Sequence, residues 1–140
     1  MQWHSGQNLK KTEAIAVLAR KAVSASPGHV ENWLFLGNAL IVLGEFREAA
    51  TSLRQAVEIA PSVVDLRILL VAALTSLDLQ EEALQHAEVA LTLAPNRADA
   101  KFYRLEILSN LKRWTEAEAD ADLSVNPRMM QQRTKSLKSE

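Results

Sequence analysis

Apolar and small residues recur along the chain with a period of 34 positions, the separation of Pro61 from Pro95. Within residues 30–61 the apolar positions twice follow the three- and four-residue spacing of an amphipathic helix. The recurring positions are Leu36, Leu40, Ala49, Leu53, Ala56 and Pro61, followed by Leu70, Leu74, Ala83, Ala87, Ala90 and Pro95. Because each period holds two helices, the pattern predicts helix pairs stacked side by side rather than a single closed core.

The period divides most of the chain into three repeats. Residues 30–63 and 64–97 are two complete repeats, each with a first helix, a turn and a second helix that is ended by a Pro. In the first of them we expect a helix to about Leu43 and another from about Phe46 to Ile59. Repeat three, residues 98–127, reaches its Pro two residues early, which predicts a shortened second helix.

Residues 1–29 precede the first complete repeat. Their helical composition stops at Pro27, because a Pro pushes the preceding residue out of the helical region. Pro27 stands one period before Pro61, so this helix takes the place of a second helix, and we interpret Trp3 to Gly6 as the remnant of the matching first helix. The segment is either a capping helix, which the end of a solenoid requires, or a partial repeat of a longer array.

The basic tail, residues 128–140, is rich in Gln, Ser, Lys and Arg. Two structures fit this composition. The tail forms either a short polar helix that covers repeat three or a disordered end.

The residues at fixed places in the repeat resemble those of the tetratricopeptide repeat family. Trp33 stands at that family's aromatic position, and small residues occupy Gly37, Ala49 and Ala56. The resemblance covers most of the chain and implies an all-α fold, an α-α superhelix of antiparallel helix pairs. It also implies a mode of action, which is to hold another polypeptide.

The later repeats exchange the sizes of two residues that face each other in the helix pairs of this family. Repeat one has Gly37 with Leu53, whereas repeat two has Val71 with Ala87. Repeat three has a large residue on the first helix and Ala121 on the second. If these pairs are in contact, their summed volume is roughly conserved, and we expect each pair to touch.

The resemblance also points to candidate binding residues. Ligands of the family lie in a concave groove lined by the first helices, where the second, fifth, sixth and ninth residues of each repeat contribute most. In this chain those residues are Glu31, Leu34, Phe35 and Asn38, then Asp65, Ile68, Leu69 and Ala72, then Asp99, Phe102, Tyr103 and Glu106. The fifth and sixth residues are all apolar, and the second residues are all acidic.

An apolar floor edged by carboxylates suits an extended segment or an amphipathic helix that carries aliphatic anchors and Lys or Arg. Two structural explanations compete with this interpretation. Acidic residues at the second place favour the start of a helix through its dipole. Some of the apolar pairs are alternatively buried between neighbouring repeats.

One familiar ligand of the family, the acidic C-terminal tail of a chaperone, is disfavoured. Its recognition uses a carboxylate clamp of Lys, Asn and Arg side chains. Reading the clamp places in this chain gives Leu34, Asn38, Leu69, Asp99 and Tyr103. Only Asn38 matches, and an acid stands where a cation belongs.

Composition excludes several other classes of function. The formal net charge of -1 and the pI near 6.3 give no support for binding nucleic acid. No apolar run reaches the roughly 18 residues of a membrane-spanning helix. The chain has no Cys, and its three His, His4, His29 and His86, are far apart, so we expect no metal site.

We find no catalytic residues and expect no cofactor, since the sequence has no Gly-rich phosphate loop and no G-x-S-x-G nucleophile. The carboxylates from Glu116 to Asp122 fit a solvated helix better than acid–base catalysis. The sequence therefore predicts a non-enzymatic protein-interaction module, in the cytoplasm by default. The alternatives are a self-associating scaffold, hence a homo-oligomer, and the regulatory portion of a larger protein.

Overall fold

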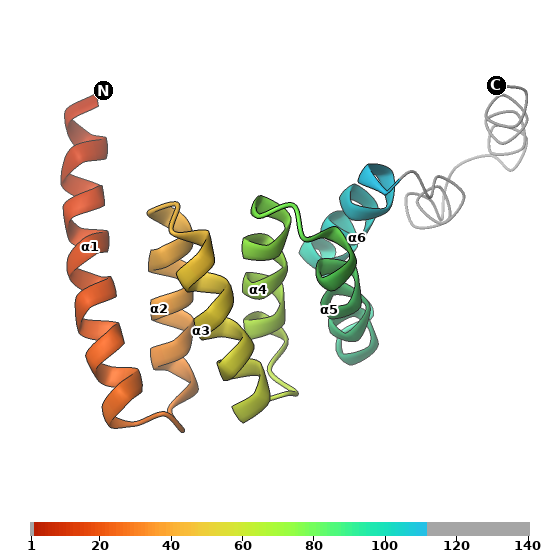
Figure 1. Ribbon diagram of the computed structural model, residues 1–140, viewed down its shortest axis with the longest axis horizontal. Helices are drawn as coiled ribbons and strands as arrows, with labels where there is room; N and C mark the ends of the chain where they lie inside the picture. The colour runs from red at the N-terminus through yellow and green to blue at the C-terminus, as the bar shows by residue number, and fades with distance from the viewer. Residues whose placement is uncertain (1, 112–140) are drawn as a thin grey trace, which may run out of the picture.

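The computed structural model describes residues 2–111 of the 140-residue chain. This part is made of helices and contains no strand (Figure 1). The helices are α1 (Gln2–Ala25), α2 (Val30–Val42), α3 (Phe46–Ile59), α4 (Val64–Ser76), α5 (Gln80–Leu93) and α6 (Ala98–Asn110). The all-α prediction is confirmed, and in residues 30–63 both helices have the expected bounds to within a residue.

The helices form a two-layered row. Each helix packs against the next one along the chain, and in addition α2 packs against α4 and α4 against α6. The first helices α2, α4 and α6 therefore make one layer, which we call the inner layer, while α1, α3 and α5 make the outer layer (Figure 1). This arrangement is the predicted superhelical stack rather than a closed bundle.

The turns inside the two helix pairs of residues 30–97 have the same backbone structure. Gly44 follows α2 with a φ of 76°, and Asp78 occupies the equivalent place after α4 with a φ of 61°. The N–H of Glu45 donates to the carbonyl of Leu40 at 2.9 Å, and Leu79 does the same to Leu74. This hydrogen-bond pattern closes a helix with a left-handed residue, which explains the Gly at the first turn.

A continuous core runs from α1 to α6. Its largest fully buried side chains are Leu36, Leu40, Leu53, Leu66, Leu70, Leu74, Ile107 and Leu108. At the centre of the first pair, a Cβ placed on Gly37 would lie 2.7 Å from Leu53 Cδ2, so α2 and α3 approach closely only because residue 37 is Gly. The predicted contact of these two residues is confirmed. Val71 and Ala87 are both buried in the same core, whereas Ala121 lies outside the described residues.

Trp33 is a packing residue, as expected from its place in the repeat. Its side chain is buried, and the indole Nε1–H donates to the carbonyl of Pro27 at 2.7 Å. One period later Arg67 makes the corresponding bond, from Nε to the carbonyl of Pro61 at 3.2 Å. The start of each of these two inner helices is thus tied to the Pro before it, although the residue that makes the bond has changed.

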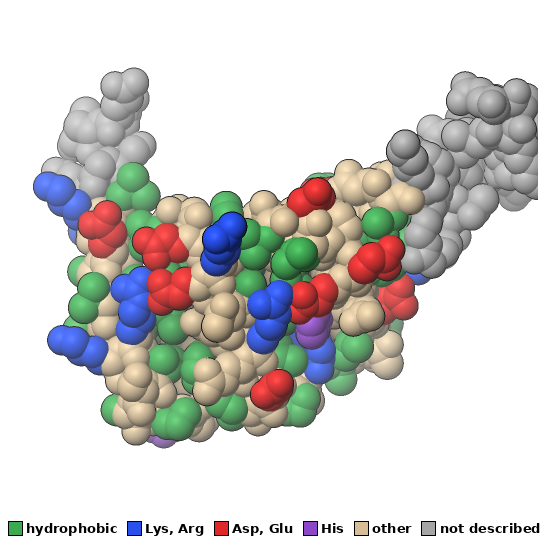
Figure 2. Space-filling view, in the orientation of Figure 1, with side chains coloured by type: hydrophobic (Ala, Val, Ile, Leu, Met, Phe, Trp, Pro, Cys, Tyr) green, Lys and Arg blue, Asp and Glu red, His purple; other side chains and the backbone are tan. Residues whose placement is uncertain are grey.

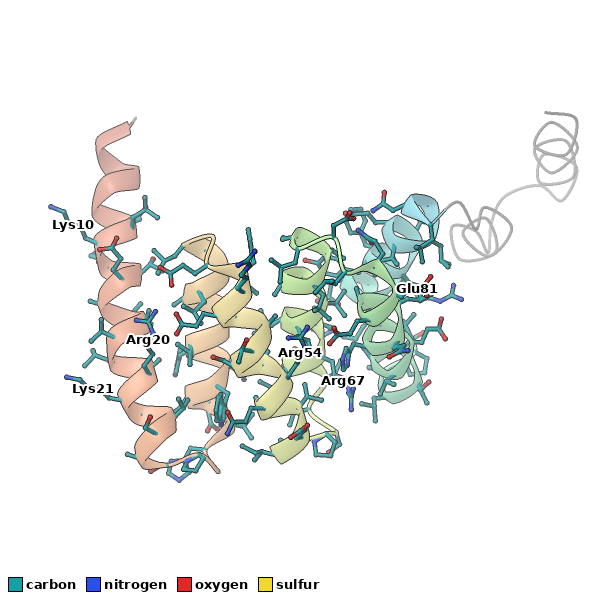
Figure 3. The ribbon with its side chains drawn as sticks, viewed as in Figure 1. Lys10, Arg20, Lys21, Arg54, Arg67 and Glu81 are labelled. Atoms are coloured by element: carbon teal, nitrogen blue, oxygen red, sulfur yellow. The ribbon has the colours of Figure 1, made fainter. Side chains whose placement is uncertain are left out.

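Successive outer helices are joined by a repeated ion pair. Arg20 on α1 donates to Glu48 on α3 through Nε and Nη2 at 2.6 and 2.7 Å. Arg54 on α3 makes the same two-pronged contact with Glu82 on α5, at 2.7 and 2.8 Å. Arg20 and Arg54 lie at a similar level of the stack (Figure 3), within a face on which acidic and basic side chains lie next to each other (Figure 2). The two pairs are 34 positions apart and have the same geometry. The arrangement of α1 relative to α3 is therefore the same as that of α3 relative to α5.

The N-terminal segment differs from one expectation. α1 is a single helix from Gln2 to Ala25, so the interpretation of Trp3 to Gly6 as the remnant of a separate first helix is wrong. A lone Gly costs a helix only about 1 kcal/mol, and no Pro follows Gly6 before residue 27, so nothing in this stretch ends the helix. The second helix of repeat three, Trp114, the acidic cluster and the tail lie outside the described residues.

None of the helices within residues 2–111 is both long enough and apolar enough to cross a lipid bilayer.

The close contact between α2 and α3 predicts a compensating pair of substitutions. Gly37→Val should destabilise the protein by about 1 to 3 kcal/mol through overpacking, and Leu53→Ala by about 2 to 5 kcal/mol through a cavity. The double variant copies the Val71 and Ala87 pair, so its loss in the free energy of unfolding should be smaller than the sum by about 0.5 to 3 kcal/mol. Urea unfolding measures all three values.

Gly28→Val is the control for this cycle, because a Cβ at Gly28 meets no atom within 4 Å. Combined with Leu53→Ala it should give an additive loss. If the losses in the free energy of unfolding from Gly37→Val and Leu53→Ala simply add in the double variant, this would contradict the contact between the two residues.

The repeated ion pair predicts a stability that depends on pH. Hydrogen bonds from Arg20 and Arg54 lower the pKa of Glu48 and of Glu82 below the usual value. A lowered carboxyl pKa contributes stability that is present above the unfolded pKa, about 4.3, and is lost as the pH falls through the folded pKa. Glu48→Gln with Glu82→Gln should therefore lower stability at pH 7 by about 0.2 to 1 kcal/mol for each pair.

Unfolding in urea from about pH 7 down to pH 3 checks this, since the gap between the parent and the double variant should close on the acid side of the usual Glu pKa. Glu58→Gln is the matched control on the surface of α3. A gap that persists unchanged at low pH would contradict the assignment.

Candidate functional site

Two of the three acidic residues at the second place of the repeats are paired with a cation of the chain itself. Arg97 Nη2 lies 2.9 Å from Asp65 Oδ1 and 3.0 Å from Asp99 Oδ2, so one guanidinium bridges the start of α4 and the start of α6. This pairing holds the pKa of Asp99 below its usual range. Asp99 Oδ1 also accepts a hydrogen bond from the N–H of Ala100, as expected for an acid at a helix start.

Tyr103 lies between two carboxylates on α6. Burial raises the pKa of its hydroxyl first, and the charges of Glu106 and Asp99 raise it further. The ring is half-buried against the core. Because one side of the ring is supported by the core and Glu106 is exposed beside it, this part of α6 offers an aromatic surface with an acidic edge.

The predicted apolar floor is not continuous. Ile68 is buried in a small cluster with Ala90 and Ala100, so the structure withdraws it from the surface where sequence reasoning placed it. The physical reason is the next repeat, since α5 and α6 cover the fifth residue of repeat two. Leu34 and Leu69 are half-buried against the main core.

Phe102 remains largely exposed on α6, with 61% of its surface accessible. Its ring stands edge to face with that of Tyr103, with the two ring centres 6.1 Å apart. It is the equivalent of the buried Ile68, one period later. The two aromatic rings therefore form an apolar corner at the α6 end of the inner layer.

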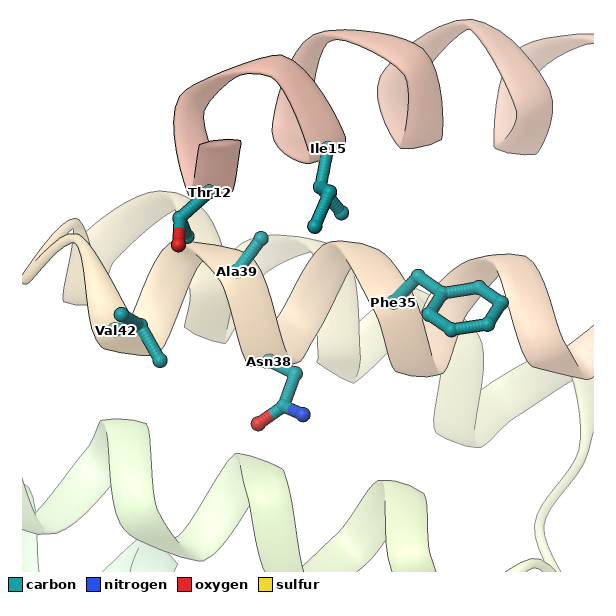
Figure 4. Close-up of a pocket in the computed structure, with 6 residues that line it drawn as sticks. All are labelled: Thr12, Ile15, Phe35, Asn38, Ala39 and Val42. Carbon is teal, nitrogen blue, oxygen red and sulfur yellow. The ribbon is translucent and has the colours of Figure 1, made fainter. Parts of the chain in front are cut away.

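The remaining predicted residues follow the exposed side of the inner layer. Glu31 and Asn38 are exposed on α2, Ala72 is half-buried on α4, and Glu106 is exposed on α6. Asn38 points away from α1, towards α4 (Figure 4). We call this surface the inner wall and define it by Glu31, Asn38, Leu69, Ala72, Tyr103 and Glu106.

Phe35 does not join the other residues of the inner wall. It is 60% exposed and lies over a hollow between α1 and α2. This hollow has a volume of about 300 Å³ and continues into a second one of about 150 Å³. We call the two together the α1–α2 cleft; Figure 4 shows its second part. Its lining residues are Thr12, Ile15, Leu18, Ala19 and Ala22 of α1, and Asn32, Phe35, Asn38, Ala39 and Val42 of α2.

Sequence reasoning missed the contribution of α1 to this surface. The available signal was the size of the apolar residues on α1. Ile15 and Leu18 stand one period before Ala49 and Ser52, which are small residues on the second helix of repeat one. Large side chains at these places are exposed here rather than packed, with Ile15 at 45% and Leu18 at 66%.

His86 has a structural partner. Its Nδ1 lies 3.0 Å from Arg67 Nη1, and burial lowers the pKa of the imidazole. The neutral ring therefore accepts a hydrogen bond from the guanidinium of Arg67. Within residues 2–111 there is no group of three or more His, Asp and Glu side chains arranged to hold a metal ion.

Comparison with known proteins gives the following similarities. The family model described as tetratricopeptide repeat matches residues 30–63. No curated protein matches the sequence. Among solved structures, the first TPR of Spaghetti (RPAP3) bound to the HSP90 peptide SRMEEVD is 23% identical with a TM-score of 0.71, over 78% of this chain and 86% of that one.

Two further solved structures have the same fold. The second TPR domain of human RPAP3, in complex with the HSP70 peptide SGPTIEEVD, has a TM-score of 0.67 at 20% identity, over 74% of this chain and 87% of that one. A crystal structure of MamA has a TM-score of 0.74 at 21% identity, over 88% of this chain and 73% of that one. Residues 30–63 thus match the tetratricopeptide repeat model, and the chain shares the fold of these solved TPR structures.

Proposed function

We propose that the chain is a non-enzymatic protein-interaction module that binds an extended polypeptide segment along the inner wall. The observation that carries this proposal is the stacking of α2, α4 and α6 into one layer with polar and aromatic residues exposed at equivalent places. The similar RPAP3 domains hold short peptides of HSP90 and HSP70, which supports a peptide as the ligand of this fold.

The charges of the inner wall favour a basic segment. Glu31 and Glu106 are exposed at its two ends, and Tyr103 lies near both Glu106 and Asp99. A Lys or Arg of the ligand placed over the Tyr103 ring would gain from both the aromatic face and the nearby carboxylates. Arg97 is engaged by Asp65 and Asp99, so its charge is already matched by acids of the chain.

The same charges disfavour the acidic chaperone tails. Leu34, Leu69, Asp99 and Tyr103 stand where the family's clamp requires cations or amides, and Asn38 alone matches. Asp99 is held in its ionised form by Arg97, because that pairing lowers its pKa. A peptide carboxylate approaching Tyr103 would therefore be repelled by the charges of Asp99 and Glu106.

Selection from a library of random peptides displayed on phage tests this proposal. We expect the selected peptides to carry Lys or Arg together with aliphatic residues. Glu106→Lys should weaken them by at least about tenfold, or about 1.4 kcal/mol, because the substitution places like charges together. The peptide SRMEEVD should not bind to the parent protein.

Glu88→Lys is the matched control, since Glu88 is exposed on the outer helix α5 and carries the same charge. Binding is measured by fluorescence anisotropy, with circular dichroism to show that both variants keep their helices. Equal losses in the two variants, or tight binding of SRMEEVD, would overturn the proposal.

A further inference from the structure

The α1–α2 cleft exposes large apolar side chains that are not part of the inner wall. Ile15, Leu18 and Phe35 are 45%, 66% and 60% exposed, and they lie around one hollow. Three large apolar side chains gathered in this way are uncommon on a surface that faces only water.

The repeat itself shows what covers such a surface. The residues one period after Ile15, Ala19 and Ala22 lie on α3 and are Ala49, Leu53 and Ala56. Each of these three residues of α3 is 0% exposed. α2 covers this side of α3, as the contact between Gly37 and Leu53 shows. One period after Phe35 comes Leu69, which is half-buried because α2 also packs against α4.

The outer helices are equivalent in three dimensions, not only in sequence. Arg20 on α1 and Arg54 on α3 bind Glu48 and Glu82 with the same atoms and nearly the same distances. α1 is therefore placed against its neighbours as α3 is. It follows that a helix in the cleft beside α1 would take the place that α2 takes beside α3 and run antiparallel to α1, with the larger Ile15 and Leu18 where α3 has Ala49 and Ser52.

The size of Ala19 indicates which residues the bound helix needs. Ala19 stands at the place of Leu53, whose partner on α2 is Gly37. In the next repeat the corresponding residue is Ala87, and the first helix carries the larger Val71. A helix packed against Ala19 therefore needs a large aliphatic residue at this place, because a Gly there would leave a hole.

We propose that the α1–α2 cleft binds an amphipathic helix of another protein, antiparallel to α1 and with a Val or Leu facing Ala19. This site is separate from the inner wall in its chemistry. The cleft is lined mainly by aliphatic side chains and Phe35, so its ligand is recognised by apolar side chains at helical spacing, whereas the inner wall is edged by carboxylates.

A fluorescein-labelled peptide with the sequence of residues 64–77 is a suitable probe, since α4 carries the larger Val71 at the place that Gly37 takes on α2. L69K in the peptide keeps it soluble, since Leu69 stands at the place of Phe35, which lies on the α1 side of α2 and not on the side of α4. We expect saturable binding to the full chain, measured by fluorescence anisotropy, and at least tenfold weaker binding to the Leu18→Glu variant.

Two controls accompany this measurement. Val89→Glu is the matched variant, because Val89 is an exposed apolar residue of α5, at 39%, outside the cleft. It should leave binding unchanged, as should Glu106→Lys on the inner wall. Absence of binding, equal losses in Leu18→Glu and Val89→Glu, or a loss in Glu106→Lys would overturn the proposal.

A reciprocal exchange tests the role of Ala19. A peptide with V71G should bind the parent more weakly than the first peptide, whereas the Ala19→Leu variant should prefer the V71G peptide. The same order of affinity for both proteins would overturn the proposed register. Sedimentation of the chain alone that shows a dimer dissociated by Leu18→Glu would overturn the assignment to another protein and give the cleft to a second copy.

Discussion

The close approach of paired helices is the interaction on which the rest of this structure depends. α2 and α3 can lie as near as they do because Gly37 has no side chain to collide with Leu53. The constraint is on the summed volume of the two facing residues and not on either residue alone. The corresponding residues of the next repeat, Val71 and Ala87, are both buried in the same core. A constant spacing between helices then allows each pair to repeat the geometry of the one before.

Constant spacing also fixes where charged residues on different helices meet. Arg20 and Glu48 are 28 positions apart, as are Arg54 and Glu82, and both pairs form the same two-pronged contact. Such exposed pairs add little to stability individually. Their value lies in showing that α1 belongs to the same helical array as α3 and α5. On the inner layer Arg97 plays a comparable part, because it joins the starts of α4 and α6 through Asp65 and Asp99.

Much of the fold could be predicted from the sequence because the repeat determines local structure. Pro61 and Gly44 set the helix ends, and the spacing of Leu36 and Leu40 sets the buried face. The continuity of α1 through Gly6 was not predicted, since a single Gly is too weak a signal to distinguish a long helix from a broken one.

The candidate site was less predictable, because exposure depends on neighbouring repeats rather than on a residue's own place. Leu34, Ile68 and Phe102 are equivalent in sequence, yet they are half-buried, buried and exposed in turn. The pairing of Asp65 with Arg97 likewise joins residues of different repeats. Asp65 and Glu31 occupy the same place in their repeats. The sequence of a single repeat therefore does not show that Asp65 is paired.

The inner wall and the α1–α2 cleft share α2, and this has a consequence for binding. Phe35 and Asn38 lie about one turn apart on that helix, with Phe35 over the cleft and Asn38 in both surfaces. A helix in the cleft would pack against α2 in the way that α2 packs against α4. It would therefore add one more helix to the inner layer, next to α2 and Glu31. Its exposed residues would lengthen the inner wall. A segment bound along that wall would then contact both proteins, so each ligand would change the affinity for the other by the same factor.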